Sequence, residues 1–312
     1  MYGRAALALS LLAGITGAWR GGHPPPSTSG GGKMASAKFV TPTRMAVLDE
    51  EFLLVTDAGS QSIVKYRISD GEAVQSVAIE GKPLAIGCLD GRVYVGNDET
   101  DRIEIYSDRG TYLGALEGTG SAVGSPSDLA IDATDRLMFV VDSKACDVKV
   151  FDLDRAGGEM VYTISRKGEN ADEFQKPTAI AIDPVAKEVF VSDYGDEENA
   201  SLNPRVLVFS YDGLYQTALS GKGGANGYRY SKPQGLAVND LGHVFVTDAW
   251  FGEICIMDRA TGEEVTTLGS YGKEPGQLWL PLDIVITGEN KDLYVTNSRV
   301  HRIEVFAEGG QN

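Results

Sequence analysis

Cysteine and histidine are scarce in this chain, which leaves few ligands for a metal or redox centre. The 312 residues include only 3 cysteines and 3 histidines. An odd number of cysteines, spread over separate repeats, does not form a disulfide framework and leaves at least one free thiol. We expect Cys146 to lie in an exposed turn, where its thiol could react or pair between molecules.

The three histidines do not converge in the sequence pattern. His23 falls in an N-terminal tether, His243 opens a predicted strand, and His301 lies in a turn at the opposite end of such a strand. A strand separates its two ends by on the order of 15 Å, far beyond the ~2 Å bonds of a shared zinc ion. A zinc site built from these histidines is therefore not expected.

Positive charge is also in deficit. The chain has 28 Lys and Arg residues against 44 Asp and Glu residues, a formal net charge of −16. Such a charge repels phosphate backbones, so nucleic acid is not expected as a partner, whereas a basic protein partner is favoured. Phosphate-binding loops, the Gly-x-Ser-x-Gly elbow and the His-Glu-x-x-His zinc motif are missing from the sequence as well.

The N-terminal residues are predicted to form a leader and a linker. Met1 to Ala18 has a basic residue, then an apolar run, then small residues, which is typical of a signal peptide. That run is shorter than the ~20 residues of a membrane span, and no later segment reaches that length. Trp19 to Ala37 is rich in Pro, Ser and Gly and is predicted to be a disordered linker. A true start at Met34 is the alternative, and the expected location is secreted or periplasmic.

The rest of the chain, residues 38–312, contains six copies of one unit. Each copy has a valine-led segment that ends in Asp or Asn, and the leading valines are spaced 40 to 55 residues apart. A proline precedes each of these valines by 12 to 14 residues. The prolines are Pro42, Pro83, Pro126, Pro177, Pro233 and Pro281, and the Asp or Asn residues are Asp57, Asn97, Asp142, Asp193, Asp248 and Asn297. Asp and Asn suit a turn after a strand because their short side chains accept hydrogen bonds from backbone amides.

Within a copy, the pattern predicts four short antiparallel strands. The proline opens the first, where its missing N–H is not required, and a glycine-bearing turn introduces the fourth. The fourth strands are predicted at Val74–Ala78, Tyr112–Leu116, Met160–Ile164, Tyr215–Leu219 and Val265–Leu268. Four such strands per unit are typical of a propeller blade, so the expected fold class is an all-β six-bladed propeller.

The sixth copy lacks a fourth strand, because the chain ends soon after Phe306. Lys38-Phe39-Val40 has β-type residues and stands just before Pro42, where every other copy is preceded by a fourth strand. We expect this N-terminal strand to complete the last blade, close the ring and cover an exposed sheet edge.

The repeats resemble those of the NHL-repeat family of six-bladed propellers. Val300-His301-Arg302-Ile303 is similar to that family's Asn-His-Arg-Ile signature, and Thr100-Asp101-Arg102-Ile103 is the second match. The resemblance covers roughly Lys38 to Phe306 and is specific for fold, because propellers host many unrelated activities. Its exported bacterial members of binding or scaffold type imply an exported binding module, while other members bind RNA or are zinc-dependent lyases.

Residues two positions after the boundary prolines are expected at the channel mouth. Asp128 and Asp283 lie three blades apart, hence across the axis, and Arg44 belongs to the blade next to that of Asp283. Two carboxylates facing a channel could hold calcium, as in related calcium-dependent lactone hydrolases. Calcium usually takes about six or more oxygens, so we favour the alternative that Arg44 and water satisfy both carboxylates.

Aromatic residues gather in the turns of one half of the predicted ring. The turns between second and third strands carry Tyr194, Trp250, Phe251 and Arg299, and the connections between blades carry Tyr228, Tyr230, Tyr271 and Trp279. Trp, Tyr and Arg dominate binding hot spots, so a partner-binding patch is predicted, with packing onto the blade tops as the alternative. An acidic insert at residues 195–204 lies on the same face.

The sequence thus predicts a non-catalytic binding or scaffold module that holds a basic protein partner on this face. A metal-dependent lyase or lactone hydrolase acting at the channel mouth is the alternative.

Overall fold

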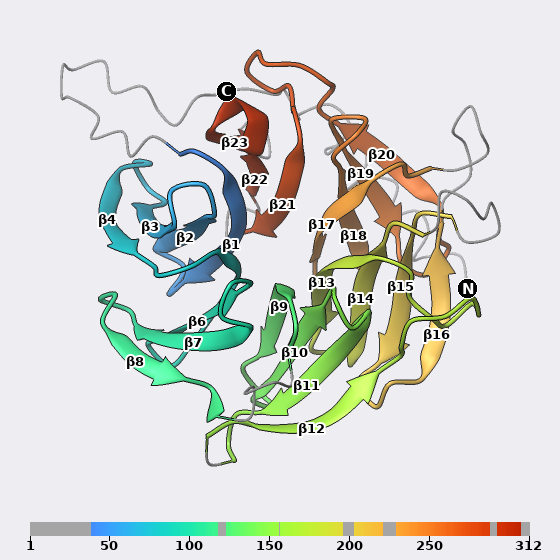
Figure 1. Ribbon diagram of the computed structural model, residues 1–312. Coiled ribbons are helices and arrows are strands. Elements are labelled where there is room, and N and C mark those ends of the chain that lie inside the picture. The colour runs from blue at the N-terminus through green and yellow to red at the C-terminus, as the bar shows by residue number, and fades with distance from the viewer. Residues whose placement is uncertain are drawn as a thin grey trace.

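Each predicted repeat forms one antiparallel sheet, and the six sheets surround a central axis (Figure 1). The computed structural model describes residues 39–117, 123–155, 157–195, 203–220, 229–287 and 292–306. Five sheets have four strands and the sixth has three among these residues. The all-β six-bladed propeller is therefore confirmed.

The blades follow one another in chain order. Blade one contains β1 (Pro42–Leu48), β2 (Phe52–Asp57), β3 (Ser62–Arg67) and β4 (Ala73–Ala78), and blade two contains β5 (Pro83–Leu89), β6 (Arg92–Asn97), β7 (Arg102–Ser107) and β8 (Tyr112–Ala115). Blade three contains β9 (Pro126–Asp132), β10 (Leu137–Asp142), β11 (Asp147–Asp152) and β12 (Glu159–Ile164), and blade four contains β13 (Pro177–Asp183), β14 (Glu188–Asp193), β15 (Arg205–Ser210) and β16 (Tyr215–Leu219). Blade five contains β17 (Pro233–Val238), β18 (His243–Asp248), β19 (Glu253–Asp258) and β20 (Glu264–Leu268). Blade six contains β21 (Pro281–Ile286), β22 (Leu293–Asn297), the 3₁₀ helix η2 (Ser298–Val300) and β23 (Arg302–Phe306).

The prolines and the Asp or Asn residues that recur in the repeats lie at the strand boundaries, as predicted. Every boundary proline opens an innermost strand, and every Asp or Asn of the repeat closes the second strand of its blade. The Asp or Asn side chain accepts hydrogen bonds from the connection that enters its blade and, in most blades, from the turn that follows. Asp248 shows this double role, because it accepts N–H bonds from Ser231, Lys232, Trp250 and Phe251 at 2.6 to 3.3 Å. One side chain thus fixes two loops on the same end of the blade.

The innermost strands line the axis and pack against one another around the ring. In each of them the pairing with the second strand is irregular just after the boundary proline, as between Pro42 and Met45 of β1. Such an irregularity removes one or two residues from the hydrogen-bonded ladder. The backbone carbonyl that follows each proline is therefore free to bind another partner at the axis.

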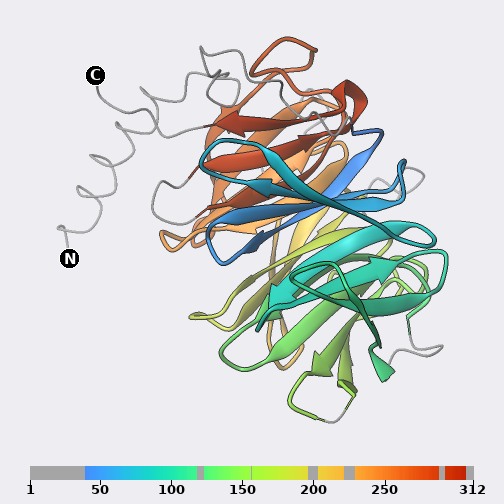
Figure 2. The same ribbon diagram turned by 90° about the vertical axis from the view of Figure 1, so that its left-hand side faces the viewer.

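The hydrophobic core is divided into layers between neighbouring blades. Between blades three and four, for example, Phe139, Val191 and Phe209 are buried in one cluster. Side chains on both faces of the middle strands are buried, because every sheet is covered by a blade on each side. In the perpendicular view, the blue strands of blade one lie between the red strands of blade six and the cyan strands of blade two (Figure 2).

The predicted closing strand is not found at Phe39 and Val40, which lie outside the sheets. Lys38, the first residue of the predicted strand, lies outside the described residues. Even in the shortest connection, β4 ends five positions before Pro83, so an equivalent strand would end at or before residue 37, outside the described residues. Among the described residues, side-chain packing helps to join the last blade to the first: Phe39 is buried with Met45, Val55 and Val64 of blade one, and Val285, Tyr294 and Ile303 of blade six pack against that cluster.

Candidate functional site

Arg44 occupies the axis of the ring. Its guanidinium donates to the backbone carbonyls of Thr178 and Leu282 at 2.6 Å each and of Ser127 at 3.2 Å. A longer contact of 3.4 Å reaches the carbonyl of Gln234. These are the carbonyls that follow the boundary prolines of blades three to six. A single side chain from blade one therefore bonds to four other blades.

Asp128 and Asp283 flank this arginine, as the repeat register predicts. Arg44 Nε lies 3.6 Å from Asp128 Oδ1, and Arg44 Nη1 lies 3.4 Å from Asp283 Oδ1. All three residues are buried. Each carboxylate also accepts a backbone N–H from the next blade, Ile180 at 3.0 Å for Asp128 and Met45 at 2.7 Å for Asp283. The prediction that these three residues meet at the axis agrees with this geometry.

One cation is shared by two buried carboxylates. Burial raises the pKa of Asp283 to about 7, against the opposing effect of Arg44, and Asp128 adds a repulsive charge. Burial likewise raises the pKa of Asp128, again opposed by Arg44. A carboxylate whose pKa is raised in the folded state favours folding more at low pH than at high pH. The axial cluster is thus a source of pH-dependent stability.

The axial geometry also bears on metal binding. The guanidinium of Arg44 stands between the two carboxylates, where a shared cation would have to sit. Within the described ranges, no group of three or more His, Cys, Asp or Glu side chains is placed to hold a metal ion. Calcium binding at Asp128 and Asp283 therefore stays a prediction, and it would require Arg44 to move.

The exposed aromatic residues form a second site on the face that carries the second-to-third-strand turns. Trp250 is 63% exposed and Phe251 42% exposed in the turn between β18 and β19, and Tyr271 is 57% exposed in the connection to blade six. The rings of Tyr271 and Trp279 meet edge to face, with centroids 6.1 Å apart. We call these four residues, Trp250, Phe251, Tyr271 and Trp279, the aromatic patch.

The two halves of the aromatic patch are held together by close backbone packing. Gly252, directly after Phe251, has a φ of +67°, and a Cβ there would lie 2.8 Å from Tyr271 Cα and 2.4 Å from the carbonyl oxygen of Leu278. Only glycine fits such an approach. The turn of blade five is thereby seated on the connection to blade six, so the patch is part of a rigid surface.

Other residues predicted for the patch have different places. Arg299 is exposed in η2, and its backbone N–H donates to the carbonyl of Trp279 at 3.2 Å, so it borders the patch. Tyr194 is half-buried, and its pKa is raised by burial, with smaller effects from Arg44 and Asp248. Tyr228 lies outside the described residues.

Tyr230 is a correction to the predicted patch. It is only 2% exposed and belongs to the core cluster between blades four and five, so it offers no surface to a partner. A comparison of the repeats could have predicted this burial. Tyr230 stands three residues before its boundary proline, and the same position holds a buried apolar residue in four other repeats: Phe39, Val123, Phe174 and Leu278.

Cys146 is a second correction, because it is buried rather than exposed. A φ of +57° at this residue turns its side chain inward, where it joins the cluster of Val148 and Phe174. Its Sγ lies 3.3 Å from the carbonyl oxygen of Gln175, and burial raises the pKa of the thiol. A buried thiol with a raised pKa is poorly suited to the reaction or pairing that the sequence suggested.

His301 has a structural place. Its Nδ1 lies 2.7 Å from the carbonyl oxygen of Val40, which links the turn of blade six to the N-terminal segment. His243 begins β18 at the other end of a blade, so the two histidines do not converge.

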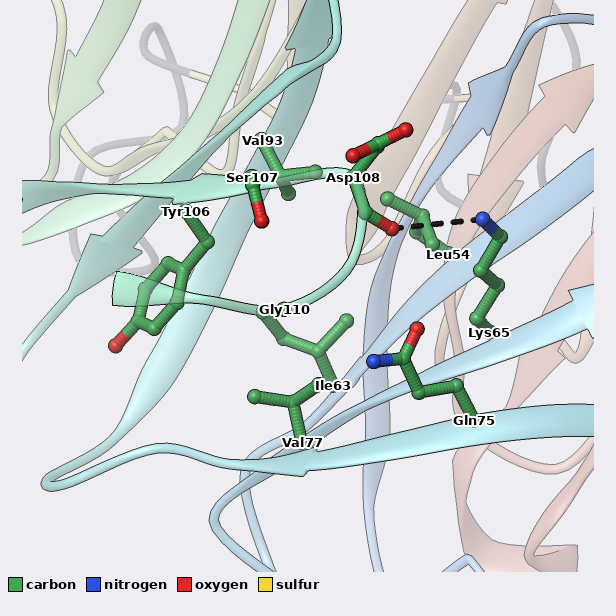
Figure 3. A pocket seen from close by; sticks show the side chains of 10 residues that line it. All are labelled: Leu54, Ile63, Lys65, Gln75, Val77, Val93, Tyr106, Ser107, Asp108 and Gly110. Carbon is green, nitrogen blue, oxygen red and sulfur yellow. Dashed lines mark hydrogen bonds between the residues drawn. The ribbon is translucent and has the colours of Figure 1, made fainter. Parts of the chain in front are cut away.

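A small pocket opens between blades one and two (Figure 3). Leu54, Ile63 and Val77 of blade one face Val93 and Tyr106 of blade two across it. Lys65 closes one side by donating to the backbone carbonyl of Asp108 at 3.5 Å. The pocket encloses about 20 Å³, which is room for about one water molecule. It is too small for a substrate.

None of the described helical segments has the length and hydrophobicity of a membrane-spanning helix.

Repeat pattern, ring and site together define a six-bladed propeller with a closed axis and an aromatic face. No family model matches the chain. Among curated proteins, it is 23% identical over 236 residues to NHL repeat-containing protein 3 of Mus musculus, which covers 72% of this chain and 63% of that protein. The chain thus spans less than two thirds of this relative. The repeats, the fold and the relative support an NHL-type propeller.

Solved structures share the fold at low sequence identity. A Kuenenia stuttgartiensis hydrazine synthase structure aligns with a TM-score of 0.61 and 16% identity over 88% of this chain and 79% of the other. A Bacteroides thetaiotaomicron protein of unknown function aligns with a TM-score of 0.65 and 20% identity, over 88% of this chain and 71% of the other. A chain in a structure of a nidogen/laminin complex aligns with a TM-score of 0.57 and 18% identity, over 73% of this chain and 80% of the other. At such identities the likeness concerns the fold alone.

Proposed function

We propose that the protein is an exported, non-catalytic scaffold or binding module that presents the aromatic patch to a protein partner. The carrying observation is the exposure of Trp250, Phe251 and Tyr271 together on one face. Exposed aromatic residues that adjoin on a rigid surface are typical of protein interfaces. The solved nidogen/laminin complex contains a chain of this fold, which supports protein binding as the role. The leader pattern of Met1 to Ala18 supports the proposal of export.

The axis supports a scaffold rather than a channel enzyme. The side-chain donors of Arg44 are used on carbonyls of the surrounding blades and on two buried carboxylates. A metal-dependent lyase or lactone hydrolase would need that position for its ion and substrate. Titration with calcium during thermal melting separates the two roles, because ligand binding to the folded state raises the melting temperature. A large rise would favour the enzyme.

Affinity capture with the full chain from its native compartment tests the scaffold role. Trp250→Ala/Phe251→Ala should fold normally and lose the partner that the unchanged protein retains. A matched control is Val185→Ala/Leu214→Ala, because those residues are 94% and 62% exposed on the opposite face. The proposal fails if both double variants retain the same partner, or if both lose it.

A further inference from the structure

We propose that the aromatic patch receives an acidic segment of the protein partner, whose carboxylates pair with Lys232, Lys273 and Arg299. This inference rests on the proposed function and names the chemistry of the partner. It departs from the basic partner that the net charge of −16 favours for the molecule as a whole. The charges next to the aromatic patch, rather than the net charge of the whole molecule, determine which partner segment can bind there.

Two lysines stand over the aromatic rings. Lys273 Nζ lies 4.5 Å from the ring centroid of Trp279, and Lys232 Nζ lies 5.5 Å from that of Trp250. The negative face of an aromatic ring attracts a cation, so each lysine is held close to the patch. Arg299 is a neighbour of Trp279, because its backbone N–H donates to the Trp279 carbonyl at 3.2 Å. Two lysines over the rings and one neighbouring arginine thus belong to the same region as the aromatic patch.

These cations have no carboxylate within ion-pair distance among the residues that the structure describes. Several lysines elsewhere are paired, as Lys82 with Asp98 at 2.8 Å and Lys149 with Asp142 at 2.8 Å. Ammonium and guanidinium groups without internal partners are available to carboxylates of another molecule. Apolar rings beside them can cover the pair and exclude water, which strengthens the attraction.

Acidic residues near the patch are already engaged or outnumbered. The carboxylate of Asp248 is fully buried and accepts backbone N–H bonds from both loops. Glu253 is bound by Arg229 at 2.7 Å. Glu274, next to Lys273, is an exposed acidic neighbour in the part of the chain that the structure describes. Among the described residues around the aromatic patch, the three cations therefore outnumber the exposed carboxylates, whereas most of the acidic insert at residues 195–204 lies outside the described residues.

The overall charge of the protein further limits the classes of partner that can bind. A net charge of −16 repels a long polyanion such as nucleic acid, whose many phosphates extend beyond the patch. A short protein segment with a few Asp or Glu residues beside apolar residues meets only the local cations and rings. Its chemistry matches the aromatic patch on both counts.

Selection from a phage-displayed library of random peptides on the immobilised full chain tests this chemistry. The retained peptides should be enriched in Asp and Glu next to aromatic or aliphatic residues. For the strongest synthetic peptide, Lys232→Glu/Lys273→Glu should weaken binding by about tenfold or more. Lys144→Glu is the matched control, because Lys144 is 70% exposed in its side chain and lies on the same end of blade three. It should leave binding nearly unchanged.

The outcomes separate the two proposals. Enrichment of basic peptides, or equal binding to the charge-reversed variant, would overturn the acidic partner even if Trp250→Ala/Phe251→Ala abolishes binding. Peptides that bind all patch variants equally would overturn the patch itself as the binding site. Displacement of the peptides by a single-stranded oligonucleotide, with tighter binding of that oligonucleotide, would assign the patch to nucleic acid instead.

Discussion

Arg44 of blade one donates to the carbonyl of Thr178 at 2.6 Å, although the two residues lie on opposite sides of the ring. Its other donors reach blades three, five and six. A planar guanidinium with five donors is the side chain that can contact so many blades at once. The side chain of one residue therefore links five of the six blades at the axis.

Arg44→Met should destabilise the protein strongly. The substitution keeps an apolar stem but leaves Asp128 and Asp283 buried without their shared cation. Removing one partner of a buried ion pair costs about 3–5 kcal/mol, which thermal melting detects as a fall in Tm. Arg299→Met, an exposed arginine without such bonds, should change stability by no more than about 0.5 kcal/mol. Equal melting of both variants would show that the axial bonds contribute little.

The pH dependence of stability should carry the signature of Asp283. Its folded-state pKa of about 7 lies above the ~3.9 of an unfolded Asp, so its contribution is fully present below about pH 4 and is lost as the pH rises through 7. Asp283→Asn should remove that part of the decline, so the variant gains Tm relative to the unchanged protein as the pH rises from about 4 to about 7. Burial lowers the pKa of His243, which acts with the opposite sign but cancels in this difference. Parallel Tm curves for the two proteins would contradict the prediction.

Periodic positions in the sequence predict the fold and the axial site. A proline at each strand start and an Asp or Asn at each second-strand end recur at similar spacing, because every blade meets the same geometric demands. The position two residues after the proline therefore identifies Arg44, Asp128 and Asp283 as neighbours without any structure. That Arg44 also binds the backbone carbonyls was not predictable, because the sequence does not display the irregular pairing after the prolines.

Loop side chains were harder to predict than strand side chains. Trp250 and Phe251 point outward as expected, whereas Tyr230 and Cys146 are turned into the core. In a strand, alternation tells which way a side chain points, but in a loop the direction depends on φ and ψ at each residue. Lys232 and Lys273, which lie over the rings of Trp250 and Trp279, belong to two different connections between blades. No repeated sequence pattern therefore predicted these contacts.

Phe39→Ala should weaken the seam between the last and first blades. Phe39 is 9% exposed and packs with residues of both blades. Truncation of a buried Phe costs about 3–5 kcal/mol, measurable by thermal melting. Val40→Ala, at a neighbouring residue that is 48% exposed, should have little effect. Deletion of residues 37–41, which also removes the N–H bonds of Val40 and Thr41 to Asp57, should lower Tm further. A neutral deletion would contradict closure by the N-terminal segment.

Gly235→Ala should destabilise the ring at the approach of blade five to blade six. A Cβ on Gly235 would lie 2.5 Å from Asp283 Cα and 2.9 Å from Ile284 N, both backbone atoms that cannot rotate away. Overpacking of this kind costs about 1–3 kcal/mol, and here it also displaces Asp283 from Arg44. Gly124→Ala is the matched control, because its nearest atom, at 3.0 Å, is Cδ of the flexible Lys144 side chain. Thermal melting should show a clear loss for Gly235→Ala alone; equal Tm values would mean that β17 and β21 can separate without cost, and that the axial cluster does not depend on their spacing.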